Sequence, residues 1–164
     1  MIESDIIYAP QKWIWSDTDF DQMGWHDAHI HALAFRPERF QLLLDIDYIF
    51  KWVQPVPGEK SYKFWVAPCT LIFKNVRQIR FSIDPIQDIS ILDITRSDPQ
   101  EINSVLGFDF LYLLACAEGE SVVRSTGYEQ FTRRPPSLVS TQRFLEKERG
   151  GFSFSSNTPP ELTN

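Results

Sequence analysis

Residues 28–53 read AHIHALAFRPERFQLLLDIDYIFKWV, and this stretch decides the fold. Apolar and polar side chains alternate through residues 40–53, which is the period of a strand with one buried face. Residues 28–35 form a second apolar run, and the intervening Arg36-Pro37-Glu38-Arg39 contains a proline that suits a turn. The stretch therefore predicts an antiparallel hairpin.

The rest of the chain repeats this pattern of short strands. Only residues 140–148, behind Ser140 or Thr141 as N-cap, indicate a helix. No connection is long enough for a helical crossover, so neighbouring strands are expected to be antiparallel. The sequence predicts a mostly all-β protein, an antiparallel meander folded into a sandwich or barrel-like sheet with at most one or two short helices. The further strands are expected at 61–66 and 69–74 (interrupted at Pro68), 76–83, 89–96, 107–117 and 120–128.

The length of 164 residues suits one domain. We expect a single β-rich domain over residues 1–152, followed by a flexible Ser/Thr/Pro-rich tail over 153–164. Aromatic residues make up 14% of the chain, and several of them are expected in or near the core. These are Trp25, Phe50, Trp52, Phe73, Phe81, Phe108 and Phe110.

Composition excludes several classes of protein. The 22 acidic and 16 basic residues give a net charge of -6, which repels phosphate backbones and argues against general nucleic-acid binding. The start of the chain has no signal-peptide pattern, and the longest apolar run, residues 110–117, is far below the ~20 residues that cross a membrane. Cys69 and Cys116 lie in apolar stretches and are expected to be buried, reduced thiols. We therefore expect a soluble, cytoplasmic protein.

All three histidines lie in Trp25-His26-Asp27-Ala28-His29-Ile30-His31. On a strand, His29 and His31 share one face with Asp27, since side chains alternate. A turn at 36–40 then places His29 opposite Asp47 and His31 opposite Asp45, and a slip of one residue would separate them. The predicted polar cluster is Asp27, His29, His31, Asp45 and Asp47.

Three interpretations of this cluster remain open. The first is structural, with cross-strand hydrogen bonds and ion pairs between histidine and aspartate. The second is a binding surface that presents carboxylates to a cationic partner and uses no cofactor. The third is a centre for one divalent metal ion, with His29, His31, Asp45 and Asp47 as ligands and an open position for water. None of the three assigns a catalytic residue.

Charge is unevenly distributed along the chain. Residues 1–50 carry nine acids and three bases, whereas residues 124–164 carry four acids and six bases. A folded domain can bring the acidic part against the basic part, although solvated faces are the simpler interpretation. The basic part includes Arg124, Arg133, Arg134, Arg143 and Arg149.

Two stretches, residues 25–31 (WHDAHIH) and 44–49 (LDIDYI), resemble a family of uncharacterised bacterial proteins of about this length. Residues 67–73 (APCTLIF), 126–128 (TGY) and 149–151 (RGG) fit the same likeness. The step His26-Asp27-Ala28 followed by an apolar strand is also similar to one immunity-protein family of bacterial toxin–immunity systems. That resemblance implies a cytoplasmic, acidic protein that neutralises its partner by binding it.

The expected function is therefore a non-enzymatic, immunity-like protein-binding module that uses the acidic and histidine-bearing face of the sheet. The alternative is a small metal-dependent enzyme with its His/Asp centre on the first hairpin. We expect a protein partner and neither a nucleic-acid nor a membrane partner, and the sequence leaves the oligomeric state open.

Overall fold

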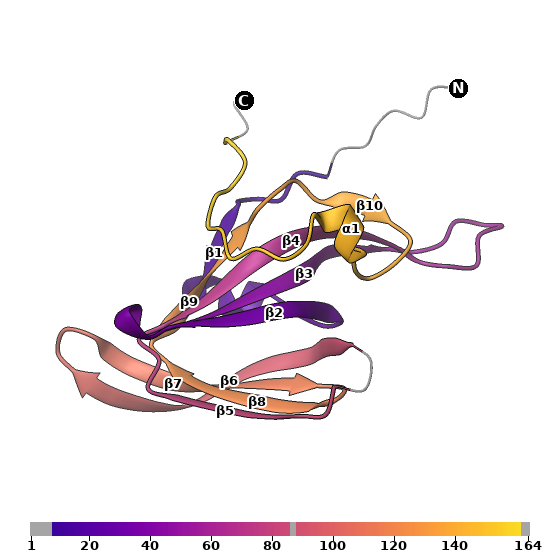
Figure 1. Ribbon diagram of the computed structural model, residues 1–164. Coiled ribbons are helices and arrows are strands. Elements are labelled where there is room, and N and C mark those ends of the chain that lie inside the picture. Colours follow the sequence, from indigo (N-terminus) through magenta and orange to yellow (C-terminus); the bar gives the residue numbers. More distant parts are fainter. Residues whose placement is uncertain (1–7, 86–87, 162–164) are drawn as a thin grey trace.

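The computed structural model describes residues 8–85 and 88–161, and it confirms the mostly all-β prediction. Within these residues, ten antiparallel strands form one sheet in the order β1-β9-β4-β3-β2-β6-β7-β8-β5, with β10 paired to β4. The sheet folds over into two layers, β1, β9, β4, β3 and β2 above and β6, β7, β8 and β5 below (Figure 1). In the part of the chain that the structure describes, the sheet is not closed into a barrel.

The elements have the following bounds. The strands are β1 (Ile14–Ser16), β2 (Ala28–Arg36), β3 (Gln41–Val53), β4 (Lys63–Lys74), β5 (Gln78–Ile83), β6 (Ile89–Asn103), β7 (Gly107–Cys116), β8 (Gly119–Ser125), β9 (Gly127–Thr132) and β10 (Ser137–Val139). The helical elements in the described residues are the 3-10 turns η1 (Asp17–Gln22) and η2 (Pro37–Arg39) and the one-turn α-helix α1 (Glu146–Arg149). No helix in the described residues has the length and apolar character needed to cross a membrane.

The main core lies between the two layers. Leu44 and Ile46 of β3 are buried there with Tyr112 of β7 and Val123 of β8. Trp25 closes this core from the loop before β2, and its indole Nε1 donates to Gln130 of β9. The alternation predicted for residues 42–48 is confirmed, because the even-numbered residues face this core.

Two β-bulges change which face later residues occupy. In β2 the register passes from Ile30↔Ile46 to Ala32↔Asp45, so His31 is an extra residue. Leu33 and Phe35 consequently pair with Leu44 and Leu42 on the inner face, and not with Leu43 and Gln41 as the continuous register would predict. The expectation that His31 lies opposite Asp45 is wrong for the same reason, whereas His29 does pair with Asp47.

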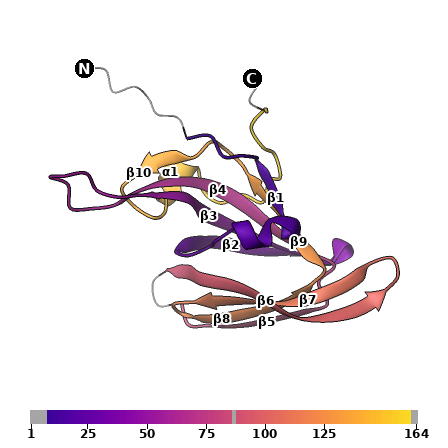
Figure 2. The ribbon, with the colours of Figure 1, turned by 180° about the vertical axis from the view of Figure 1, so that it is seen from behind.

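The second bulge corrects the prediction that Trp52 is a core residue. Phe50 is the extra residue in β3, and beyond it Trp52 pairs with Phe64 on the outer face of the upper layer, the face away from the lower layer. Trp52 is 42% exposed. Phe81 and Phe108, also expected near the core, are exposed; Phe108 belongs to the β6–β7 hairpin, which extends beyond the upper layer (Figures 1 and 2).

Pro68 does not interrupt its strand. On one side β4 pairs with β3 throughout, and Pro68 lies opposite Asp47. On its other side β4 pairs first with β10, up to Val66, and then with β9, from Cys69. Pro68 sits where one partner gives way to the other, so its missing N–H removes no ladder hydrogen bond there.

The C-terminal part crosses the outer face of the upper layer. We call residues 140–155, which include α1, the C-terminal strap; it lies over β3 and β4 (Figure 1). Under it, Phe144 packs with Ile49, Phe64 and Val66 in a second, smaller core. The helix expected over residues 140–148 is reduced to α1, because residues 140–143 form bends, Leu145 is extended, and the Phe144 N–H donates to Asp47 of the sheet.

Candidate functional site: the strap anchor and its pocket

The outer face of β3 carries the two aspartates that the sequence singled out. Asp45 and Asp47 are two residues apart on a central strand, so both carboxylates point toward the C-terminal strap. Neither has any exposed surface. A buried carboxylate is unfavourable unless it is paired and hydrogen bonded, so each must find cationic or N–H donors.

Arg149 is the main partner of both aspartates. Its Nη1 donates to Asp45 Oδ2 at 2.7 Å and its Nη2 to Asp45 Oδ1 at 2.7 Å, a bidentate pair. Its Nε and Nη2 also donate to Asp47 Oδ1, at 3.2 and 3.1 Å. The Arg149 side chain is fully buried, so two carboxylates share one guanidinium out of contact with water.

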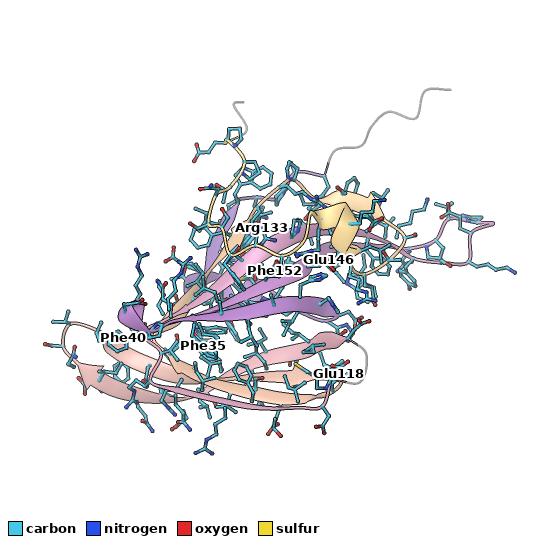
Figure 3. All side chains as sticks on the ribbon, viewed as in Figure 1. Phe35, Phe40, Glu118, Arg133, Glu146 and Phe152 are labelled. Carbon is cyan, nitrogen blue, oxygen red and sulfur yellow. The ribbon has the colours of Figure 1, made fainter. Side chains whose placement is uncertain are left out.

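Further donors complete the network. Arg133 donates to Asp45 Oδ1 at 2.7 Å and also binds Thr70 Oγ1 and the carbonyl of Ser153. The Ser153 N–H donates to Asp45 Oδ2 at 2.9 Å. Figure 3 shows Arg133 on the strap side of the upper layer, with Glu146 and Phe152. We call Asp45, Asp47, His31, Arg133 and Arg149 the strap anchor.

His31 joins the strap anchor through its bulge. Its Nε2 lies 2.7 Å from Asp47 Oδ2, which also accepts the Phe144 N–H at 2.8 Å. Burial alone would raise the pKa of Asp47, but the hydrogen bond from His31 and the charge of Arg149 outweigh it and hold that pKa below its usual value. For Asp45, hydrogen bonds from Arg149 and Arg133 likewise overcome burial and lower the pKa.

His29 lies beside the strap anchor but takes no part in its ion pairs. Burial first, and then the charges of His31 and Arg143, lower the pKa of His29 to about 4. The imidazole is therefore neutral at pH 7, and its Nε2 lies 3.4 Å from Arg143 Nη1. Its Nδ1 is buried and has no hydrogen-bond partner in the described part of the chain.

An open pocket of about 590 Å³ lies next to His29. We call it the strap pocket; it lies between the strap, the ends of β2 and β6, and the β3–β4 hairpin. Two aromatic side chains, Trp52 and Tyr62, line it with more than 40% of their surface exposed. Its charged lining residues are Asp27, Asp88 and Arg143.

The charged groups of the strap pocket are held in place by one another. Asp27 Oδ2 accepts from Gln142 Nε2 at 2.7 Å and lies 3.0 Å from His26 Nδ1. Asp88 pairs with Arg143 at 2.5 Å. Asp27 has a left-handed backbone with φ 63, a conformation that aspartate tolerates better than most residues. The strap therefore supplies one wall of the pocket, and Asp27 and Asp88, each in contact with a strap residue, supply its carboxylates.

The structure thus divides the predicted polar cluster. His31, Asp45 and Asp47 converge in the strap anchor, whereas Asp27 and His29 line the pocket. Asp45 and Asp47 were expected to face a partner, but the strap covers them. Their burial is tolerated because Arg133 and Arg149 of the same chain neutralise their charge. Ser153 and Ser155, placed in the flexible tail by the sequence, hydrogen bond to Asp45 and Thr70 through their backbones.

The pairing of Asp45 and Asp47 within the strap anchor also concerns the predicted metal centre. Among residues 8–85 and 88–161, no group of three or more His, Cys, Asp or Glu side chains is arranged to hold a metal ion. The oxygens of Asp45 and Asp47 already accept hydrogen bonds from arginine, histidine and backbone N–H groups. Cys69 and Cys116 are buried free thiols, as predicted, and burial raises their pKa to about 12 and about 11.

The strap residues that complete the site were not assigned to it from the sequence. The available signal was the basic C-terminal part of the chain, which includes Arg133 and Arg149. Two carboxylates on the interior of a central strand require cations, and this part of the chain is where they are concentrated. Comparisons of the chain with models of protein families, with curated proteins and with solved structures found no match.

Proposed function

We propose that the protein is a non-enzymatic binding module that takes a lysine or arginine side chain of a partner protein into the strap pocket. The observation that carries the proposal is the combination of two exposed aromatic side chains, Trp52 and Tyr62, with the carboxylates of Asp27 and Asp88 in one open pocket. A cation over an indole or phenol face gains about 0.5–2 kcal/mol. A neighbouring carboxylate adds a charge-assisted hydrogen bond.

The strap anchor supports this proposal because it fixes the pocket before any partner arrives. Arg149 is buried between Asp45 and Asp47, and Phe144 is held by a backbone hydrogen bond and by the second core. The adjoining residues Gln142 and Arg143 are thereby kept beside Asp27 and Asp88. A preformed pocket loses less conformational entropy on binding than a mobile one.

The surroundings of His29 favour binding over catalysis. A histidine that acts as general base is normally oriented by a hydrogen bond at its second nitrogen. In His29, Nε2 faces the guanidinium of Arg143 and Nδ1 has no carboxylate partner in the described residues. The ring is better explained as a neutral wall of the pocket.

The overall charge suits a basic partner. The net charge of -6 attracts a positively charged protein and accelerates its approach. Asp27 lines the strap pocket, and it is the central residue of the motif His26-Asp27-Ala28 that is similar to the immunity-protein family. A basic toxin is a partner of the proposed class, with neutralisation by binding as the result.

The proposal can be tested with a minimal probe. N-acetyl-arginine methylamide is titrated into ¹⁵N-labelled protein, and the indole N–H of Trp52 and the amides of Ser61 and Ser90 are followed by NMR. We expect saturable shifts with a Kd on the order of 1 mM, and at least fivefold weaker binding of the uncharged citrulline analogue.

Variants identify the groups responsible. Asp27→Asn and Trp52→Ala are each expected to weaken binding of the arginine probe at least fivefold. Phe152→Ala changes an exposed strap aromatic that does not line the pocket, and it serves as the matched control. Equal binding of the citrulline analogue, or shifts that do not saturate, would exclude a cation-binding pocket.

A further inference from the structure

The strand β5 ends the sheet, and one of its edges has no partner among the described strands. Its other edge pairs with β8 over all six residues, from Gln78↔Arg124 to Ile83↔Gly119, without a bulge. The opposite end of the sheet is the three-residue strand β1. A regular, unprotected edge of this length is a template for another strand, because its outward N–H and C=O groups are available.

Apolar side chains are exposed along this edge. Phe81 lies between Ile79 and Ile83, which pack on the main core, so it faces the space between the layers. It is 42% exposed, and its ring lies 6.3 Å from that of Phe35, which is 51% exposed. Figure 3 shows Phe35 on the side of β2 that faces the lower layer. Two phenylalanines exposed at the rim of the core indicate a surface that a further strand would cover.

Charges of opposite sign mark the two ends of the edge. Arg80 lies in the first half of β5 and is exposed. Asp84, directly after β5, and Glu120, paired with Ser82, are also exposed. The edge is thus basic at one end and acidic at the other.

We propose that the partner of this edge is a second copy of the chain, which pairs its own β5 antiparallel to form a two-fold symmetric dimer. In an antiparallel pair, the basic end of each strand meets the acidic end of the other. Such self-complementarity is what a two-fold interface requires. With Phe81 opposite Phe81 of the second copy, Ile79 meets Ile83 on the inner face, and Arg80 lies diagonal to Asp84 within reach of its long side chain.

Sedimentation velocity over a range of protein concentrations tests the dimer. We expect the wild-type chain to approach twice its 19.1 kDa mass as its concentration rises. Arg80→Glu places two acids together at each contact, and Asp84→Arg places two bases together. Each single variant is expected to weaken dimerisation at least tenfold, with unchanged circular dichroism.

Charge restoration is the decisive measurement. An equimolar mixture of the Arg80→Glu and Asp84→Arg chains, and the double variant Arg80→Glu/Asp84→Arg, both recreate opposite charges at the contact and are expected to dimerise. Asp93→Arg, a reversal at an exposed position of β6 across the lower layer from β5, is the control and leaves dimerisation unchanged. A wild-type chain that stays monomeric, or a dimer that survives both single reversals, would refute the interface.

Discussion

At the scale of the residue, Asp45 and Asp47 show how a buried charge can serve structure. Both carboxylates lie on the second strand of the predicted hairpin, and both are fully covered by a segment about a hundred residues later in the chain. Pairing a buried ion contributes little net stability, whereas breaking the pair is costly because it leaves an uncompensated charge. The strap anchor therefore specifies where the C-terminal strap lies.

Replacing one of these aspartates tests that role. Asp47→Asn removes a negative charge beside the buried Arg149 while keeping the shape of the side chain. We expect it to lower the free energy of unfolding by about 3 kcal/mol, measured by urea denaturation. Asp93→Asn, at an exposed strand position, is the control and should change stability by less than about 0.5 kcal/mol. Equal stability of the two variants would show that the pair does not fix the strap.

His29 gives stability a pH dependence that can be separated from that of the aspartates. Its pKa of about 4 in the folded protein lies below its ordinary value of 6.5, so the unfolded chain binds more protons between these values. The contribution of neutral His29 to the free energy of unfolding is therefore fully present above about pH 6.5. It is lost as the pH is lowered toward 4, which reduces the free energy of unfolding by about 1–3 kcal/mol. The lowered pKa values of Asp45 and Asp47 cause a further loss at still lower pH.

Unfolding free energies measured from pH 7.5 to 4 check this dependence. His29→Gln is expected to flatten the profile between pH 6.5 and 4. His26→Gln, in which the replaced side chain is 66% exposed, is expected to keep the wild-type slope. An unchanged slope in His29→Gln would show that His29 is not the group responsible.

At the scale of the element, the C-terminal strap is fastened by packing as well as by charge. Phe144 is 4% exposed and fills the second core with Ile49, Phe64 and Val66. The guanidinium of Arg134 lies 4.6 Å from the centre of its ring, which adds a cation–π contact. The apolar and ionic contacts lie at neighbouring positions of the strap, so one short segment carries both the packing against the second core and the ion pairs of the strap anchor.

A pair of alanine substitutions compares a buried phenylalanine of the strap with an exposed one. Phe144→Ala leaves a cavity between the strap and the sheet, and we expect a loss of about 3 kcal/mol in thermal or urea unfolding. Phe152→Ala removes a 65% exposed ring from the same strap, and its effect should stay within about 0.5 kcal/mol. Similar losses in both variants would contradict the second core.

Elements also mark where sequence reasoning succeeds and where it fails. Alternation predicted the inner face of residues 42–48 and the pairing of His29 with Asp47, because both follow from strand periodicity and a local turn. The bulges at His31 and Phe50 were not predictable, since an extra residue is defined only against a partner strand. These bulges bring His31 to Asp47 and turn Trp52 toward the strap pocket.

At the scale of the whole molecule, the contact of Arg149 with Asp45 and Asp47 explains why the position of the C-terminal strap was not predicted from the sequence. Arg149 lies 102 residues from Asp47, and nothing in the local pattern around either residue selects the other. The uneven charge of the chain indicated that its acidic and basic parts could meet, without indicating which residues pair. The folded sheet makes that choice by burying the two carboxylates side by side under the strap, where Arg149 contacts both.

The same contact links the fold to the proposed function. The strap supplies Gln142 and Arg143 to the strap pocket, while the β5 edge proposed to dimerise belongs to the lower layer (Figure 1). The surfaces proposed for partner binding and for dimerisation are therefore separate, and we expect loss of the strap anchor to weaken partner binding more than dimerisation.

The most direct test of the strap anchor is native-state hydrogen exchange at the backbone amides of Phe144 and Ser153. Each N–H donates to a fully buried carboxylate, Asp47 for Phe144 and Asp45 for Ser153. A strap that belongs to the folded unit predicts that both amides exchange as slowly as those of the central strands. Exchange at the rate of an unstructured peptide would show that the strap is not held by the two aspartates.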